Sequence, residues 1–245
     1  DLNRVAARYK SATPAGFEFR VFSFCNLSTS QEGRLLVFNK GFLNMEERLA
    51  GKNILIIIPK DYYMESEFDP ILESMNAEGA NILIASGKMK EAVGMKGGRV
   101  SPDVLIVDAI EGITGDSYVS AGKGVRQIKG VFHGVIVIGG NGARSYLWKD
   151  KLLQLLINDR HRSRMVIAGI GSAVPCLGNA GLLQSLEVTT EPGNKKAVAE
   201  LETSKAVLVE EPMTSCDRIF TVRDASCIAD FLDPFIEEVA KTPKK

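Results

Sequence analysis

Four short segments of almost purely apolar sequence constrain the fold of this chain more than any other feature. They are residues 53–59 (NILIIIP), 80–85 (ANILIA), 135–138 (VIVI) and 165–170 (MVIAGI). Continuous apolar runs of this length are typical of strands that are covered on both faces. Because parallel sheets bury their strands in this way, the four runs predict a parallel sheet between two layers of helices.

Segments with helical spacing of apolar residues alternate with these runs. Phe68, Ile71, Leu72 and Met75 follow that spacing within residues 67–77, and Leu147, Leu152, Leu155 and Leu156 within residues 145–158. The sequence pattern predicts a closing helix over residues 225–241. It also predicts further strands at residues 104–107, 206–209 and 218–222. We expect residues 87–101 to form a hairpin or loop and residues 159–164 a polar loop. Alternating strands and helices favour a mainly parallel sheet.

Composition and charge exclude several classes of protein. Of the 245 residues, 45% are hydrophobic and 24% are charged, so the chain can bury a full core. The 30 Lys and Arg residues balance the 30 Asp and Glu residues, which gives no overall field for nucleic acid or an anionic membrane. No apolar run approaches the ~20 residues of a membrane span. With only two histidines, His133 and His161, a histidine-rich metal site and a mechanism that needs several imidazoles are disfavoured. We expect no metal and no cofactor.

The cysteines and the first residue bear on the compartment. Cys25, Cys176, Cys216 and Cys227 form no CxxC pair, and their wide spacing predicts reduced, mostly buried thiols. The chain begins at Asp1 and not at Met, which favours removal of a targeting segment. We therefore expect an organellar location, in a mitochondrion before a plastid, with the cytoplasm as the alternative.

Two glycine-containing turns follow predicted strands. Residues 165–183 (MVIAGIGSAVPCLGNAGLL) read as a strand, a tight turn and a helix, and residues 139–142 (GGNG) follow the strand at 135–138. A strand-to-helix turn places a side chain and backbone N–H groups where nucleophiles, oxyanions or phosphates are bound. Two such turns at one sheet edge predict a crevice between them.

The same stretches, in this order, resemble the ThiJ/PfpI family, the protein deglycase and intracellular protease group with the class I glutamine amidotransferase-like fold. The resemblance rests on residues 54–86, residues 134–150, the turn ending in Ala180-Gly181-Leu182-Leu183, and the final strands and helix from LEVTTEPG onward. It covers about residues 52–241. It implies a flavodoxin-like α/β fold, with a mainly parallel sheet, helices on both faces and an additional N-terminal extension.

The resemblance also implies which residues occupy the family's active-site positions. The family uses a cysteine at the turn, a carboxylate that tunes its thiol, and a histidine that assists proton transfer. Counting back from Ala180, the cysteine position falls on Gly171 and the next on Ser172. The histidine position after the Thr-Thr pair is Glu191, and the carboxylate corresponds to Glu67, with Glu65 as second choice.

The nucleophile and both candidate histidines of the family are therefore replaced. We expect a catalytically inactive, vestigial pocket. Its residues are Glu67, Gly139, Gly140, Gly171, Ser172 and Glu191. The alternative is a hydrolase or a glyoxalase- or deglycase-like enzyme that uses Ser172 with Glu67. We interpret Cys176 as a buried thiol, and Glu67 as a hydrogen-bonded acid rather than half of a hard-cation site with Glu191.

The N-terminal segment differs from the family core. We divide the chain into an extension (1–51), a ThiJ/PfpI-like domain (52–241) and a polar tail (242–245). The extension holds six of the eleven phenylalanines, and Phe17, Phe19 and Phe22 are its expected anchors to a partner protein. The lost nucleophile and this extension together favour a structural or accessory subunit of a larger complex, with a small-molecule sensor as a further alternative. A homodimer, which is common in the family, is also compatible with the sequence.

Overall fold

The computed structural model describes residues 47–111 and 132–243 of the chain. The chain divides into two units, Asp1–Leu43 and Asn44–Lys245, and all that follows concerns the second. The predicted extension lies almost wholly outside the described residues, together with its anchors Phe17, Phe19 and Phe22 and with Cys25. Its partner-binding role stays a prediction.

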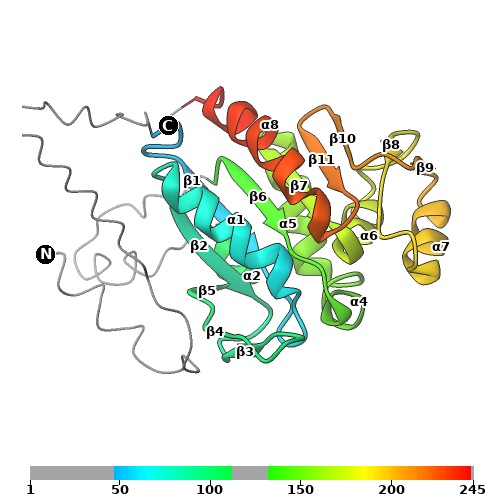
Figure 1. The fold of residues 1–245 in the computed structure, drawn as a ribbon, viewed down its shortest axis with the longest axis horizontal. Helices are drawn as coiled ribbons and strands as arrows, with labels where there is room; N and C mark the ends of the chain where they lie inside the picture. Colours follow the sequence, from blue (N-terminus) through cyan, green and yellow to red (C-terminus); the bar gives the residue numbers. More distant parts are fainter. Residues whose placement is uncertain (1–46, 112–131, 244–245) are drawn as a thin grey trace, which may run out of the picture. The chain divides into compact units, whose positions relative to one another are not determined.

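A seven-stranded sheet in the order β10-β11-β7-β6-β1-β2-β5 forms the centre of the domain (Figure 1). Its strands are β1 (Asn53–Ile57), β2 (Asn81–Ser86), β5 (Val104–Leu105), β6 (Gly134–Val137), β7 (Val166–Ile170), β10 (Met213–Cys216) and β11 (Ile219–Val222). All neighbours are parallel except β10, which is antiparallel to β11 at one edge. The four apolar runs form β1, β2, β6 and β7, as the sequence predicts.

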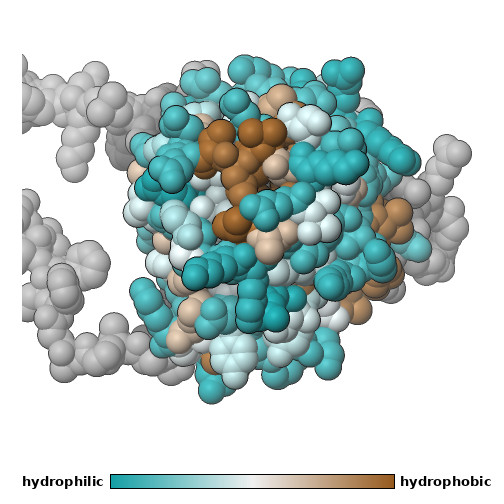
Figure 2. Space-filling model, turned by 90° about the vertical axis from the view of Figure 1, so that its right-hand side faces the viewer, coloured by the Kyte–Doolittle hydropathy of each residue, from teal (hydrophilic) through white to brown (hydrophobic). Residues whose placement is uncertain are grey.

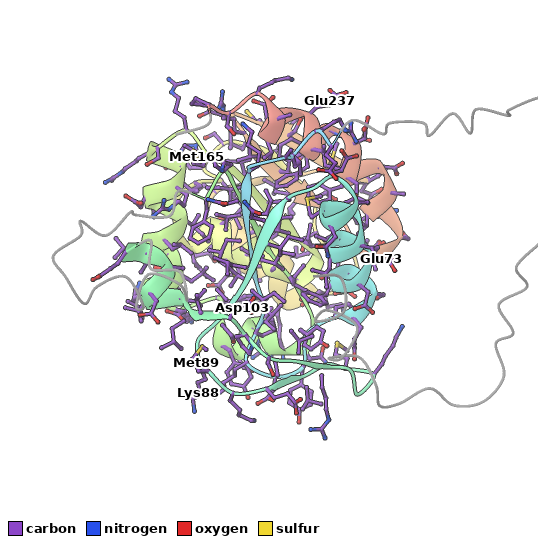
Figure 3. The ribbon with its side chains drawn as sticks, turned by 90° about the vertical axis from the view of Figure 1, so that its left-hand side faces the viewer. Glu73, Lys88, Met89, Asp103, Met165 and Glu237 are labelled. Carbon is purple, nitrogen blue, oxygen red and sulfur yellow. The ribbon has the colours of Figure 1, made fainter. Side chains whose placement is uncertain are left out.

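Helices cover both faces of this sheet. One face carries α1 (Glu65–Ala77) and α8 (Ile228–Ala240), whose apolar residues form one core with β1, β6 and β7. The other face carries α2 (Ile106–Glu111), α5 (Lys151–Arg162) and α6 (Val174–Asn179), which form a second core. In Figure 3 the sheet is seen nearly edge-on, and Glu73 of α1 and Glu237 of α8 lie on the outer side of their helices. The predicted flavodoxin-like α/β fold is confirmed.

Smaller elements surround the carboxyl ends of the strands. They are the hairpin of β3 (Ala92–Val93) and β4 (Arg99–Val100), the helix α4 (Asn141–Tyr146), the 3-10 turns η3 (Gly171–Ala173) and η4 (Ala225–Cys227), the parallel pair β8 (Glu187–Val188) and β9 (Val207–Leu208), and the helix α7 (Lys195–Thr203). Figure 2 views the side on which α7, β8 and β9 lie, where the upper part of the face carries a hydrophobic patch bordered by hydrophilic residues. The hairpin agrees with the prediction for residues 87–101.

The structure corrects two predicted elements. The strand expected at residues 104–107 stops after Leu105, because the chain turns into α2 at Ile106. The single helix expected at residues 145–158 is two helices, since Asp150 caps a new helix by accepting hydrogen bonds from the N–H groups of Leu152 and Leu153. The restart changes the helical phase.

As a result, Leu152 and Leu155, which were expected on the apolar side, are 43% and 55% exposed. Leu156 is buried as expected, and Leu153 and Ile157 are buried in place of the two exposed leucines.

Two further differences concern polar residues. The loop expected at residues 159–164 is mostly the end of α5, where Arg160 is buried and donates to the carbonyl of Ile110. Thr242, which was expected in a polar tail, is 2% exposed and accepts a hydrogen bond from buried Lys52. Packing also begins before residue 52, since Leu49 is fully buried. Across the described ranges, no helix has the length and hydropathy needed to cross a bilayer.

The order of the strands places a crevice at one edge of the sheet. From β1 the chain moves outward to β2 and β5, and then returns to β6 on the other side of β1. The carboxyl ends of β1 and β6 therefore lie at a topological switch point, where open α/β sheets bind their ligands. Gly139 and Gly140 follow β6 at this point, and Gly171 follows β7 beside it.

Candidate functional site

Gly171 forms the sharp turn between β7 and α6. Its φ of +51° lies in the left-handed region that favours glycine. The hydroxyl of Thr190 donates a 2.9 Å hydrogen bond to the Gly171 carbonyl, which ties the segment after β8 to the turn. Because Gly171 has no side chain, the turn presents no nucleophile at the position where a nucleophilic residue would act.

Glu67, in the first turn of α1, faces Gly171 and Gly139. Its side chain is 3% exposed, and Oε2 accepts a 2.8 Å hydrogen bond from the N–H of Gly139. A Cβ atom built on Gly171 would lie 2.7 Å from Oε1 of Glu67. The acid thus occupies the space beside the missing side chain.

The surroundings of Glu67 favour its neutral form. Burial raises its pKa to about 8, and the negative charges of Glu191 and Asp224 act in the same direction. The hydrogen bond from Gly139 opposes this shift by stabilising the carboxylate. At neutral pH most Glu67 side chains are therefore protonated, as expected for a buried acid that has no cationic partner among the described residues.

Ser172 is held by the backbone of the neighbouring glycine turn. Its side chain is 7% exposed, and Oγ accepts from the N–H of Gly140 at 2.8 Å and donates to the Gly140 carbonyl at 3.0 Å. In the part of the chain that the structure describes, no carboxylate or imidazole forms a hydrogen bond with this oxygen. The proton of Ser172 is directed to a carbonyl oxygen, which cannot serve as a general base.

The backbone donors beside the turn are also used internally. The N–H of Gly139 donates to Glu67, and the N–H of Gly140 donates to Ser172. A pair of free N–H groups at such a place could stabilise an oxyanion, but both N–H groups here already have an acceptor.

Gly140 cannot be replaced readily, because its φ is +104° and a Cβ there would lie 2.4 Å from the carbonyl oxygen of Tyr62.

Neither histidine lies at this edge of the sheet. His133 immediately precedes β6, and its Nδ1 accepts from the N–H of Asn53 at 2.9 Å. His161 is on α5, with Nε2 3.4 Å from Oδ2 of Asp217. Both lie before the amino ends of their strands, whereas Gly139 and Gly171 follow the carboxyl ends. Neither imidazole can assist chemistry at Gly171 or Ser172.

The remaining candidates do not form a second reactive centre. Cys176 is fully buried in α6, and burial raises the pKa of its thiol well above the usual range. Glu65, the second choice for the family carboxylate, instead accepts hydrogen bonds from the N–H groups of Lys96 and Gly98 at 2.6 and 3.1 Å. It fixes the β3–β4 hairpin. Within residues 47–111 and 132–243, no three His, Cys, Asp or Glu side chains are placed to hold a metal ion.

An open pocket of about 670 Å³ lies in front of these residues. Gly140, Asn141, Arg144, Ser172, Glu191 and Lys195 are among the residues that line it. Glu191 and Ser172, which the sequence places in a vestigial pocket, therefore border the same space, while Glu67 lies buried behind it.

The sequence does not reveal two features of this site. Trp148 donates a 2.7 Å hydrogen bond from Nε1 to the carbonyl of Ser172, and no local sequence pattern indicates this contact. The cationic side of the pocket, with Arg144 and Lys195, comes from two helices more than forty residues apart. No local motif brings these residues together, because their proximity depends on how α4 and α7 pack beside the turn.

Comparison with known proteins identifies the family and the fold. The model of the DJ-1/PfpI family matches residues 52–238, which is more than half of the chain. The chain belongs to the DJ-1/PfpI family. The uncharacterized protein MJ0967 of Methanocaldococcus jannaschii is 24% identical over 200 residues, which cover 82% of this chain and 86% of that protein.

Solved structures of the DJ-1/PfpI superfamily share the fold. The ThiJ/PfpI domain protein from Brachyspira murdochii has a TM-score of 0.65 and 22% identity, covering 80% of this chain and 99% of that chain. Drosophila melanogaster DJ-1beta has a TM-score of 0.62 and 18% identity, covering 79% of this chain and 92% of that chain. The predicted family resemblance is confirmed, and at these identities the structural likeness establishes the fold alone.

Proposed function

We propose that this chain is a catalytically inactive member of the DJ-1/PfpI family. The observation that carries the proposal is Gly171, which occupies the strand-to-helix turn beside Glu67 without offering a nucleophile. Covalent catalysis needs an activated nucleophile with a base nearby. Ser172, the next residue, donates to the carbonyl of Gly140, and no carboxylate or imidazole of the described residues is hydrogen-bonded to its hydroxyl.

The experiment is a turnover assay on the purified full chain with methylglyoxal and with peptide substrates. We expect rates equal to those of heat-denatured protein, and the same result for Ser172→Ala. Turnover that Ser172→Ala abolishes would instead establish the hydrolase or glyoxalase-like alternative. Turnover that survives this substitution would place the chemistry on another residue and would also contradict the proposal.

We further propose that the protein acts as a structural or accessory subunit of a larger organellar, mitochondrial complex, through residues 1–51. The support is in the sequence: six of the eleven phenylalanines lie in this segment. Native purification tests the idea, since a subunit elutes with other proteins at a mass well above 26.6 kDa. Elution as a monomer or homodimer with no other protein would contradict it, and organelle fractionation tests the location.

A small-molecule sensor is the second candidate for the same inactive core. The observation that favours it is the pocket of about 670 Å³ in front of Gly140 and Ser172, which remains although the nucleophile is gone. Ligand pockets in proteins commonly have volumes of roughly 300–1,000 Å³.

A further inference from the structure

The charged residues that line the pocket in front of the glycine turns are mostly cations. Arg144 of α4 and Lys195 and Lys196 of α7 line it, against one lining carboxylate, Glu191. Within the described residues, none of the three cations takes part in an ion pair. Burial raises the pKa of Glu67 to about 8, so this acid adds little negative charge behind the pocket at neutral pH.

A second hollow adjoins the first and continues its charge. This hollow has a volume of about 460 Å³, and Arg144, Trp148, Lys149 and Lys196 line it together with one carboxylate, Glu200. Arg144 and Lys196 line both hollows, so these two cations stand where the hollows meet. Figure 1 shows α4 and α7, which supply them, on the same side of the domain. A ligand that spans the junction would contact both cations.

The positions of the two lysines add to this positive field. Lys195 and Lys196 are the first two residues of α7, and the first turn of this helix contains no acidic residue. The amino end of a helix carries partial positive charge, so cations there are unfavourable unless an anion is near. The fold therefore places several positive charges around the pocket, and a bound anion would neutralise them.

We propose that this pocket binds a small anionic metabolite without covalent chemistry, with its phosphate or carboxylate group between Arg144 and Lys196. This inference rests on the proposed inactive function and names the class of ligand for the sensor alternative. Arginine and lysine side chains bind phosphate and carboxylate oxygens through charge-assisted hydrogen bonds. The space above Ser172 and Asn141 accommodates the rest of the ligand.

Trp148, the only tryptophan of the chain, allows a direct test. It lines the second hollow and is hydrogen-bonded to Ser172, so an anion at the junction changes its surroundings. Inorganic phosphate and succinate are each titrated into the full chain at constant ionic strength, with Trp148 fluorescence and calorimetry as readouts. We expect saturable binding of at least one probe, and the two titrations distinguish a phosphate from a carboxylate ligand.

Single-charge variants connect the binding to the pocket. We expect Arg144→Gln and Lys196→Gln each to weaken binding by about three- to tenfold. Arg162→Gln is the matched control, because Arg162 is exposed at the end of α5, before the amino end of β7, and forms no ion pair within the described residues. This control removes the same charge and should leave binding unchanged.

Two results would overturn the inference: saturable binding of neither probe, or equal weakening in all three variants. The outcome is separate from that of the inactive-function proposal. Turnover together with binding that depends on Arg144 would refute inactivity and keep the anion site. Absence of both turnover and binding would keep inactivity and refute the site.

Discussion

At the scale of single residues, Gly171 and Gly181 provide a matched pair of positions. Both have positive φ angles, +51° and +80°, but a Cβ on Gly171 would lie 2.7 Å from Oε1 of Glu67, while a Cβ on Gly181 would meet no atom within 4 Å. A left-handed conformation costs a residue with a Cβ about 1–2 kcal/mol. Gly171→Ala should therefore lower the free energy of unfolding more than Gly181→Ala, as measured by urea denaturation. Equal losses would show that Glu67 moves away freely.

Glu67 predicts a pH dependence of stability at the same scale. Its pKa in the folded protein is about 8, above the ordinary value of 4.5, so the folded state holds a proton that the unfolded state releases between these values. The contribution of Glu67 to the free energy of unfolding is fully present below about pH 4.5 and is lost as the pH rises to about 8. The loss is at most roughly 1.4 kcal/mol per pKa unit.

The control for this prediction is Glu67→Gln, which keeps an oxygen to accept the Gly139 hydrogen bond and cannot titrate. The free energies of unfolding of both proteins are measured between pH 5 and pH 9. The free energy of unfolding of the wild type should fall relative to that of Glu67→Gln as the pH rises. A difference that is independent of pH would mean that Glu67 is ionised throughout.

At the scale of elements, the break between α4 and α5 depends on Asp150. Its side chain accepts from the N–H groups of Leu152 and Leu153 at 2.8 and 3.3 Å. Replacement of such a cap by alanine typically costs about 0.5–2 kcal/mol, so we expect that loss for Asp150→Ala in thermal or urea unfolding. Asp150→Asn keeps a cap acceptor and should retain most of the stability. Equal losses in both variants would show that the charge matters more than the cap.

The same break explains why this helix was predicted incorrectly. Leucines at 147, 152, 155 and 156 fit one helical face only if the helix is continuous. The cap at Asp150 starts a new phase, and the buried face becomes Leu153, Leu156 and Ile157. In contrast, β1, β2, β6 and β7 were predicted within one or two residues, because a fully apolar run has no alternative to burial on both faces.

At the scale of the whole molecule, the described strands and helices form two hydrophobic cores, one on each face of the sheet. We therefore expect a chain that lacks residues 1–45 to fold, with cooperative unfolding reported by Trp148 fluorescence. If the extension binds partners, the shortened chain should lose the proteins that co-purify with the full chain. An insoluble product would contradict the first expectation, and retention of every partner would contradict the second.

The sequence by itself determined the layered α/β fold, the family, and the absence of a side chain at Gly171, since each follows from local apolar pattern or from residue type. Only the tertiary structure showed that Ser172 and Glu67 occupy the N–H groups of Gly140 and Gly139. It alone also brought Arg144 of α4 next to the lysines of α7 around one pocket. Contacts between residues far apart in the chain depend on strand order and helix packing, and a periodic pattern in one segment contains no information about its neighbours in space.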